Sequence, residues 1–427
     1  MRTTLSDTDT LQLSTMAEGL VGSEIIKLAG KVKTLQQEGH KVHNLTIGDF
    51  DPEVFPIPEE LKEEIKTAYD NAETNYPTAN GMLELREAIS TFVSENGGPD
   101  YDPSHIQVSS GARPLIHAVY QVALDPGETV VFPVPSWNNN HYSHLAHAEQ
   151  APVLTRAEHD FMPTANDLSP LLSNAGLVSL CSPLNPTGTM LGRNDLADIC
   201  DLIIEENRKR TGERKPLYLL YDQIYWTLTF GTEHCDPVSV RPEMRPYTII
   251  IDGMSKGFAA TGVRVGWAMG PEHFINKMRA VLGHIGAWAP KPEQMATARY
   301  LNNKEAVNSY LERMRQRVHD RLEGFYNGFM DLKKAGHSVD AIAPQAAIYL
   351  TVRFELIGKR TPAGSLLENT EDITAYLLNN AGVALVPFYA FGAPKSSTWY
   401  RISVGTVPDG NVPEVLNDLR IALEELN

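Results

Sequence analysis

The chain has 427 residues, and its 37 Lys and Arg against 53 Asp and Glu give a formal net charge of −16. A chain this acidic repels a phosphate backbone and an anionic lipid surface, so nucleic acid and membrane are not expected partners. Hydrophobic residues make up 42% of the chain and charged residues 21%, which is typical of a folded globular protein and excludes a disordered one.

The cysteines and the N-terminal segment indicate a reducing compartment. Cys181, Cys200 and Cys235 match no zinc or redox spacing, and an odd number does not suit a disulfide framework. The polar segment 1–14 is unlike a signal or transit peptide, and no apolar run approaches the ~20 residues of a membrane span. We therefore expect a cytoplasmic protein.

The N-terminal part of the chain is expected to be largely helical. Apolar residues that include Ile25 recur on one face of Ser23–Gly39, and Gly39 is a suitable stop. Further helices are predicted near Pro58–Tyr69 and over Leu83–Asn96.

Short apolar strands then alternate with helical stretches. Most of them are followed by Gly, Ser, Asn or Asp, and one leads into a predicted helix over Arg113–Leu124. Strands that are apolar on both faces predict a mostly parallel sheet with helices on both sides, whose carboxyl ends line a ligand crevice. The predicted strands are Ile106–Val108, Thr129–Phe132, Leu177–Cys181, Leu217–Tyr221 and Tyr247–Ile251.

The C-terminal part has a different pattern. Apolar residues at steps of three and four predict one helix of about 28 residues within Val307–Gly336, long enough to connect two domains. Alternation over Ile348–Phe354 and Tyr400–Val404 predicts strands of a separate α+β domain. We expect a large domain of residues 61–305 and a small domain built from residues 1–60 and 306–427.

A lysine directly after a predicted buried strand is the strongest local signal. Lys256 follows Gly253-Met254-Ser255, and Arg264 lies eight residues on, between glycines. Burial lowers the pKa of a lysine, and a neutral amine can form a Schiff base. The planar fork of Arg264 suits a phosphate group. Read alone, the pair also fits a lysine that extends to solvent and a structural arginine.

An aspartate ends another apolar strand. Asp222 follows Tyr221, and Tyr225 lies three residues beyond it. A buried carboxylate has to be paired, and it is able to hold a pyridinium nitrogen protonated, which makes a pyridine ring an electron sink. Tyr225 would reach the phenolic oxygen of such a ring. The alternative is an aspartate that caps a helix.

Three further turns follow predicted strands. Ser110-Gly111-Ala112-Arg113 opens a helix, whose free amides form an anion site when small residues allow close approach. Trp137 is able to stack on a planar cofactor, although an isolated Trp more often belongs to a core. Asn185 begins an Asn-Pro-Thr-Gly turn, and its place after a strand points its amide toward the same crevice.

Other kinds of site are not indicated. Neither a Walker A sequence nor a G-x-G-x-x-G fingerprint is present. His141, His144 and His147 recur every third residue, but no carboxylate or Cys completes a metal set, so we expect a partly solvated helix and no metal.

The order and spacing of these motifs resemble the class I/II aminotransferases, which are pyridoxal-phosphate enzymes of fold type I. The likeness covers nearly the whole chain. Leu45-Thr46-Ile47-Gly48-Asp49 is similar to the family's N-terminal substrate loop, and Asn75-Tyr76-Pro77 with Gly81 and Leu85-Arg86 is similar to its Y-x-x-x-x-G-x-x-x-L-R segment. Tyr400-Arg401-Ile402-Ser403 is similar to the strand that carries the carboxylate-binding arginine.

The resemblance implies a role for each residue of the site. Lys256 would carry pyridoxal 5′-phosphate and move the substrate proton, while Asp222 would pair with the pyridinium nitrogen. Tyr225 and Asn185 would bond the phenolic oxygen, and Trp137 would cover the ring. Arg401 would clamp the substrate carboxylate with help from Asn185 and the Gly48 backbone. The phosphate would be held by Gly111, Ala112, Arg113, Ser255 and Arg264, together with Tyr76 of the partner subunit in a homodimer with shared active sites.

Two features depart from the family pattern. Trp288 and Lys291 replace a stretch of small residues that lies near the partner subunit's site in relatives, and Ile25 is an apolar residue at the pocket border. They leave the donor unresolved between an aspartate-like and an aromatic or broad-specificity amino acid.

We expect a transaminase that exchanges an amino group between an α-amino acid and a 2-oxo acid. A lyase, decarboxylase or oxidase on the same scaffold would share every cofactor residue. A regulator that senses the cofactor is the remote alternative, because the segment before Ser23 is too short and too acidic for a DNA-binding domain.

Overall fold

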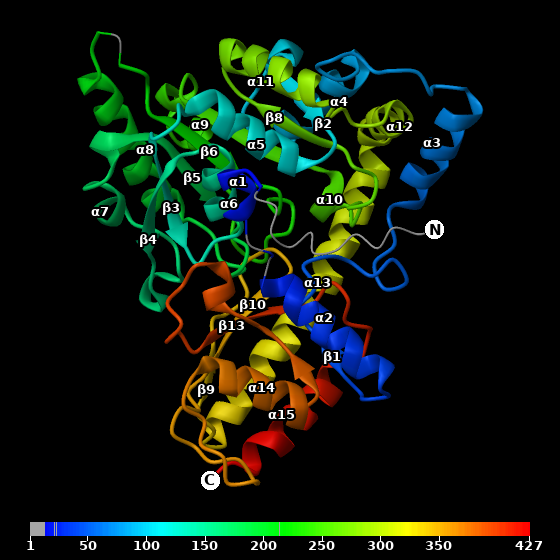
Figure 1. The fold of residues 1–427 in the computed structure, drawn as a ribbon. Coiled ribbons are helices and arrows are strands. Elements are labelled where there is room, and N and C mark those ends of the chain that lie inside the picture. The colour runs from blue at the N-terminus through cyan, green and yellow to red at the C-terminus, as the bar shows by residue number, and fades with distance from the viewer. Residues whose placement is uncertain (1–12, 21, 23, 213) are drawn as a thin grey trace, which may run out of the picture.

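The computed structural model describes residues 13–20, 22, 24–212 and 214–427. The molecule has a wide upper part built on a seven-stranded sheet and a narrower lower part built on a four-stranded sheet. The long helix α13 (Lys304–Lys334) runs through both parts (Figure 1). Its 31 residues extend the predicted helix by three residues at its N-terminal end.

The large sheet is mostly parallel, as predicted. Its order is β2-β8-β7-β6-β5-β3-β4, and β8 alone runs antiparallel to its neighbours within the described residues. The strands are β2 (Ile106–Ser109), β3 (Thr129–Val134), β4 (Glu149–Leu154), β5 (Ala175–Cys181), β6 (Tyr218–Asp222), β7 (Thr248–Gly253) and β8 (Gly266–Met269). The sequence did not indicate β4 and β8, since β4 is largely exposed and β8 has only four residues.

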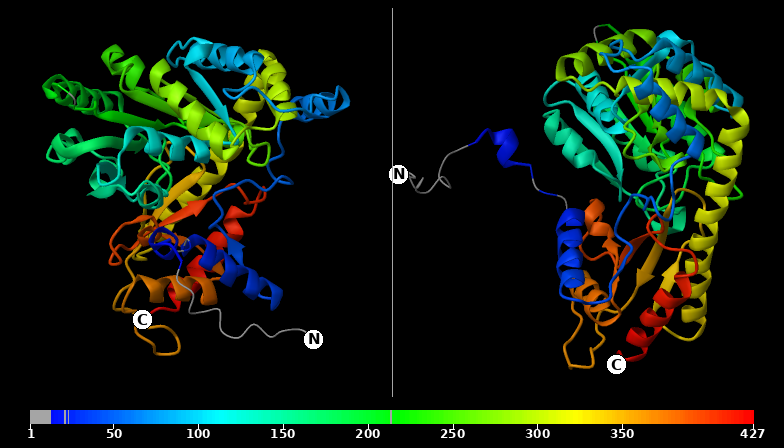
Figure 2. Two further views of the ribbon diagram at one scale, coloured as in Figure 1. Left: turned by 45° about the horizontal axis from the view of Figure 1, so that its top comes forward. Right: turned by 90° about the vertical axis from the view of Figure 1, so that its right-hand side faces the viewer.

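Helices cover both faces of this sheet (Figure 2). Leu220 and Ile249 pack with α5 (Ala112–Ala123) and α11 (Glu272–Ile285) on one face, whereas Leu219 packs with α8 (Arg193–Lys209) on the other. Because neighbouring residues of one strand are buried on opposite faces, the strands read as continuous apolar runs. The other helices of this part are α3 (Glu59–Asp70), α4 (Leu83–Glu95), α6 (Asn139–Leu145), α7 (Ala165–Leu168), α9 (Pro237–Val240), α10 (Met254–Gly257) and α12 (Lys291–Asn302).

The lower part joins the two ends of the chain. Its sheet has the order β12-β13-β10-β9, and the short N-terminal strand β1 pairs in parallel with β11. The strands are β1 (His43–Asn44), β9 (Val339–Ala341), β10 (Tyr349–Phe354), β11 (Val383–Ala384), β12 (Val386–Pro387) and β13 (Trp399–Ser403). The helices are α2 (Glu24–Gln37), α14 (Thr370–Asn380) and α15 (Val412–Glu424), while α1 (Thr15–Glu18) lies beside the upper part.

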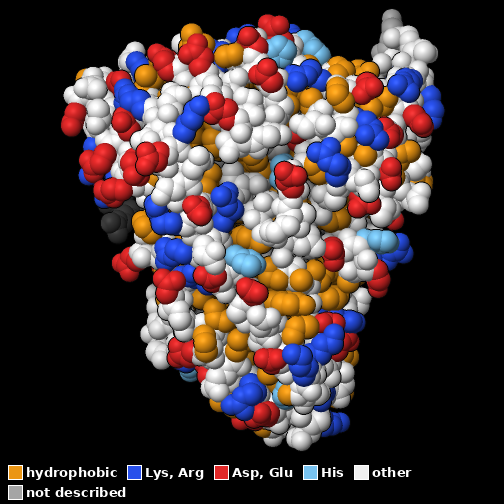
Figure 3. All heavy atoms as spheres, turned by 180° about the vertical axis from the view of Figure 1, so that it is seen from behind, with side chains coloured by type: hydrophobic (Ala, Val, Ile, Leu, Met, Phe, Trp, Pro, Cys, Tyr) orange, Lys and Arg blue, Asp and Glu red, His pale blue; other side chains and the backbone are white. Residues whose placement is uncertain are grey.

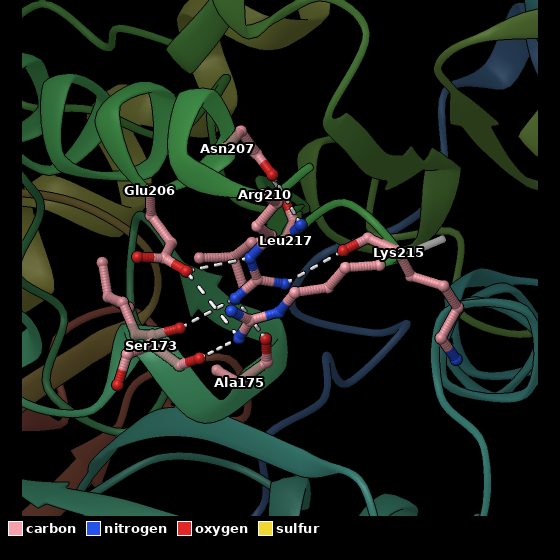
Figure 4. A network of polar contacts seen from close by, with 9 residues as sticks. Ser173, Ala175, Glu206, Asn207, Arg210, Lys215 and Leu217 are labelled. Atoms are coloured by element: carbon pink, nitrogen blue, oxygen red, sulfur yellow. Dashed lines mark hydrogen bonds and ion pairs between the residues drawn. The ribbon is translucent and has the colours of Figure 1, made fainter. Parts of the chain in front are cut away.

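A buried polar cluster closes the amino ends of β5 and β6 (Figure 4). Arg210 follows α8, and its guanidinium donates to Glu206 Oε1 at 3.0 Å and to the carbonyls of Leu172, Ala175 and Lys215 at 2.7–3.2 Å. Asn207 bonds both the amide and the carbonyl of Leu217, just before β6. The cluster therefore ties the end of α8 to the start of two central strands.

The surface mixes charges of both signs. Seen from behind, acidic and basic side chains are interspersed, and hydrophobic side chains gather where the wide and narrow parts meet (Figure 3). Within the residues that the structure describes, no helix is both long enough and apolar enough to cross a lipid bilayer.

Candidate active site

A cavity of about 690 Å³ lies where the carboxyl ends of the central strands face the lower sheet. Eleven of the thirteen residues that the sequence singled out line it. These are Gly48, Ala112, Arg113, Trp137, Asn185, Asp222, Tyr225, Ser255, Lys256, Arg264 and Arg401. Residues more than 350 positions apart in the chain thus meet in one place.

Lys256 sits on α10, the single turn that follows β7. Its Nζ donates to the carbonyl oxygen of Gly48 at 2.7 Å. Burial lowers the pKa of Lys256 to about 8, while the nearby Asp49 carboxylate acts in the opposite direction. The amine is therefore able to lose its proton near neutral pH, as a nucleophile requires.

Asp222 ends β6 and faces the same cavity. Its Oδ1 accepts a hydrogen bond from the amide of Ile224 at 3.1 Å, so the segment turns here without forming a helix. Burial raises the pKa of Asp222 to about 6, against the effects of that hydrogen bond and of Lys256. A buried carboxylate that forms no ion pair within the described residues is suited to a cationic ligand.

Tyr225 also lines the cavity. Its Oη lies 2.7 Å from the Oη of Tyr349, and the two rings meet edge to face with centroids 5.5 Å apart. Burial raises the pKa of both hydroxyls, so both stay protonated at neutral pH.

An anion cradle forms between Gly111 and Arg264. Gly111 precedes α5 with φ +92°, and a Cβ there would clash with the Arg264 guanidinium. Arg264 donates to the carbonyls of Ser110 and Thr261 at 2.7 Å each, and the buried Ser255 of α10 lines the same cavity. The free amides of the α5 N-terminus and a fixed guanidinium together suit a phosphate group.

Arg401 enters the cavity from the lower sheet. The predicted alternation of β13 is confirmed, since Tyr400 and Ile402 lie in the core while the Arg401 side chain reaches the cavity. Arg401 donates to Asn185 Oδ1 at 2.9 Å and to the Thr46 carbonyl at 2.5 Å. Its Nε is buried and has no partner among the described residues.

A third guanidinium, that of Arg113, also lines the cavity. Arg113 lies over the ring of Trp137, with its Cζ 4.4 Å from the ring centroid. Ile25 of α2 adds an apolar residue to the border, as expected. The stacking holds both the arginine and the indole in place.

Tyr76 lies outside the cavity of its own chain. Its side chain is 83% exposed, and its ring contacts Trp288 with centroids 5.5 Å apart. Lys291 Nζ donates to Asn75 Oδ1 at 2.6 Å in the same region. The three residues are therefore neighbours on the surface of the upper part.

Sequence reasoning missed three residues of the site. Asp49 lines the cavity, and Tyr349 and Phe391 flank the Arg401 guanidinium at 4.6 and 5.0 Å from its Cζ to their ring centroids. Asp49 had a signal, because it directly follows Gly48. Tyr349 lies within the predicted strand Ile348–Phe354, but nothing in the sequence indicated its partner, and Phe391 had no signal.

The histidines do not gather around a metal. His141 and His144 lie on α6, whereas His147 follows it, and His144 Nε2 contacts the Met16 carbonyl oxygen at 2.7 Å. No group of three or more His, Cys, Asp or Glu suited to a metal occurs in the described part of the chain.

Comparison with known proteins identifies the family. The family model for aminotransferase class I and II matches residues 40–419. The aspartate aminotransferase of Rhizobium meliloti (strain 1021) is 29% identical over 411 residues, which cover 95% of this chain and 94% of the relative. That of Geobacillus stearothermophilus is 28% identical over 404 residues, covering 93% and 96%.

Solved structures agree with the sequence match. The crystal structure of the Rhizobium meliloti aspartate aminotransferase superposes with a TM-score of 0.89 at 27% identity, covering 98% of this chain and all of the other. The Thermus thermophilus aspartate aminotransferase with maleate gives 0.85 at 26% identity, covering 97% and 100%. The cavity also fits the expected cofactor, since it offers an amine of lowered pKa, a buried carboxyl group and an anion cradle. The chain therefore belongs to the class I and II aminotransferases, enzymes that depend on pyridoxal 5′-phosphate.

Proposed function

We propose that this aminotransferase exchanges the amino group of an aspartate-like α-amino acid with a 2-oxo acid. The observation that carries the proposal is Arg401, a buried guanidinium whose Nε has no partner among the described residues and which faces the cavity that holds Lys256. The names of the relatives support an acidic donor. Arg113 supports it too, because a dicarboxylic substrate needs a cation for its second carboxylate besides Arg401.

Lys256 is the proposed nucleophile and proton carrier. When bound, the cofactor supplies an aldehyde that takes up the amino group and a ring that withdraws electrons. The lowered pKa of Lys256 leaves its Nζ free to attach the cofactor, and later to move the proton of the substrate α-carbon.

Asp222, Tyr225 and Asn185 would set the electronics of the cofactor ring. Asp222 would keep a pyridinium nitrogen protonated, and the two neutral groups would bond the phenolic oxygen. Trp137 would cover the ring, and Arg113 stacks on the indole. Asp222 would thus maintain the positive charge on which the electron-withdrawing property of the ring depends.

The anion cradle would hold the phosphate. Its members are Gly111, Ala112, Arg113, Ser255 and Arg264. The Arg113 guanidinium, held over Trp137, would bind either the phosphate or the second carboxylate of the substrate. Arg401 would bind the α-carboxylate, oriented by Asn185 and by the Gly48 segment.

We further propose a cytoplasmic homodimer in which Tyr76 of the partner subunit completes the phosphate site. The exposure of the Tyr76 ring supports contact with a second copy, as does the gathering of hydrophobic side chains at the waist in Figure 3. The three unpaired cysteines support a reducing compartment. Within each copy, residues 61–305 would form the large domain, with 1–60 and 306–427 as the small one.

A half-reaction tests the proposed function. Holoenzyme mixed with L-aspartate alone is expected to convert its absorbance to that of the pyridoxamine form and to release one equivalent of oxaloacetate. Released ammonia, carbon dioxide or hydrogen peroxide would instead favour the lyase, decarboxylase or oxidase alternative. A spectrum that responds to other amino acids but not to L-aspartate would refute the acidic donor.

A further inference from the structure

The cavity holds six charged side chains, and the proposed function gives partners to five of them. Asp222 would pair with the cofactor nitrogen, Lys256 would attach the cofactor, and the three arginines would bind phosphate or carboxylate groups. Asp49 is the one charged side chain of this lining to which the proposed function assigns no ligand group. A carboxylate in a half-buried position is costly unless a cation meets it.

The backbone presents the Asp49 carboxylate to the cavity. The preceding residue, Gly48, accepts the hydrogen bond of Lys256 Nζ, and Asp51 is held by a bond from its amide to the Gly405 carbonyl at 3.0 Å. Gly405 has no Cβ, which would otherwise clash with the carbonyl oxygen of Asp49. The segment is therefore fixed from both sides.

One oxygen of this carboxylate is free. Asp49 Oδ1 accepts a hydrogen bond from the amide of Phe50 at 2.8 Å, whereas Oδ2 accepts no hydrogen bond and joins no ion pair among the described residues. No direct ion pair joins Asp49 to Lys256, yet its charge acts on the Lys256 amine. The carboxylate thus lies beside the place where an incoming amino group has to react.

We propose that Asp49 is a substrate-binding residue that holds the α-ammonium group of the incoming amino acid beside Lys256. An α-amino acid carries its carboxylate and ammonium on one carbon, and Gly48 lies next to the Arg401 guanidinium, since a Cβ built there is 3.5 Å from Arg401 Nη1. A donor whose carboxylate binds Arg401 therefore directs its ammonium toward Asp49. The inference rests on the proposed function.

The amino acid and the 2-oxo acid differ in the ammonium group that Asp49 would bind. A 2-oxo acid has the carboxylates but no ammonium, so the Asp49 charge repels it while attracting the amino acid. Asp49 therefore favours the amino donor over the oxo acid at a site that must accept both.

The test uses holoenzyme with the variant Asp49→Asn, which keeps the Oδ1 acceptor for Phe50 and removes the charge. L-2-methylaspartate has the ammonium but no α-hydrogen, and succinate has two carboxylates without an ammonium. The Kd of each is measured from the cofactor absorbance. We expect the Kd of L-2-methylaspartate to rise about tenfold and that of succinate to fall about threefold, on the scale of a lost or relieved charge contact. The KM values for L-aspartate and oxaloacetate are expected to move in the same opposite directions.

Glu53→Gln is the matched control, because Glu53 is an exposed carboxylate on the same segment outside the cavity. It is expected to leave both dissociation constants unchanged. Asp49→Ser, which also retains an acceptor, replaces Asp49→Asn if the latter does not bind cofactor. Equal changes for the two ligands, or no change, would overturn the role of Asp49. A wild-type enzyme that fails the half-reaction would instead contradict the proposed function.

Discussion

Arg210 and Arg401 are two buried guanidinium groups at opposite ends of β5. The side chain of Arg210 is 3% exposed and Arg401 is 2% exposed. Arg210 bonds the Ala175 carbonyl at the amino end of the strand, whereas Arg401 bonds Asn185, four residues beyond the carboxyl end. Their burial is alike, but their hydrogen bonding is not.

Arg210 makes four hydrogen bonds to protein groups and contacts Glu206 as a counter-ion (Figure 4). Arg401 makes two, both to uncharged oxygens, and no carboxylate pairs with it among the described residues. A buried cation whose hydrogen-bond donors all have protein partners stabilises the fold. A buried cation that lacks such partners and lies beside a cavity is suited to binding an anionic ligand. The carboxyl end of the sheet is thus built for ligands and the amino end for stability.

The largest expected effect is a loss of turnover on substitution of Lys256, at the carboxyl end of the large sheet. Lys256→Ala removes the nucleophile, so transaminase turnover is expected to fall by several orders of magnitude. Thermal unfolding of the apoprotein should change little, because a buried amine of lowered pKa is replaced by a small apolar group. A coupled assay and a melting curve check both. Substantial turnover in purified Lys256→Ala would refute the proposed mechanism.

Arg210→Met is expected to lower the free energy of unfolding by about 3–5 kcal/mol, because Glu206 and three carbonyls lose their partner inside the protein. The kcat/KM per folded molecule should stay at the wild-type value. Denaturant titration with activity normalised to cofactor content separates the two quantities. An Arg210→Met variant that keeps its stability but loses activity would contradict the assignment of Arg210 to stability and of the carboxyl end of the sheet to ligand binding.

Asp222→Asn is expected to have a smaller effect that depends on pH. The pKa of Asp222 is about 6 in the folded protein and 3.8 ordinarily, so folding favours the neutral carboxyl group. The folded state is therefore most stable below about pH 4, where the group is neutral, and the free energy of unfolding falls as the pH rises through 6 and the buried group becomes charged. At pH 8 the apoprotein variant should therefore be more stable than wild type by about 1–3 kcal/mol.

At pH 4, close to the ordinary pKa of the carboxyl group, the difference in stability between the two apoproteins should shrink to below about 1 kcal/mol. The loaded Asp222→Asn variant should still lose catalysis, because an amide cannot hold the pyridinium proton. Equal stability of variant and wild type at both pH values would show that Asp222 carries no buried charge.

Strand ends were the part of the site that the sequence could predict. Asp222, Lys256 and Asn185 each follow an apolar run, and carboxyl ends of parallel strands share one edge of a sheet. The position of Arg401 also followed from alternation within a single strand. The mostly parallel sheet was predictable for the same reason, since its runs are apolar on both faces.

Contacts between distant segments were not predictable in this way. The hydroxyls of Tyr349 and Tyr225 are in hydrogen-bond contact although the residues are 124 positions apart in the sequence. Arg210 donates to the carbonyl of Leu172, which lies 38 residues earlier. Basic residues clustered at the end of a helix ordinarily suggest a solvated surface, yet the Arg210 side chain is buried. A long side chain at a helix end reads as exposed unless the neighbouring strand ends are known.

The most direct measurement compares Arg401→Lys with Arg210→Lys. Each keeps the charge and loses the planar fork. For both variants and wild type, kcat/KM is measured with L-aspartate and with β-alanine, which lacks the α-carboxylate, beside the free energy of unfolding. In Arg401→Lys the ratio of the two kcat/KM values should fall by more than tenfold, since truncating such a pair costs ~2–5 kcal/mol. In Arg210→Lys the ratio should hold while stability falls. Equal losses for both substrates in Arg401→Lys would contradict the assignment of this arginine to the substrate carboxylate.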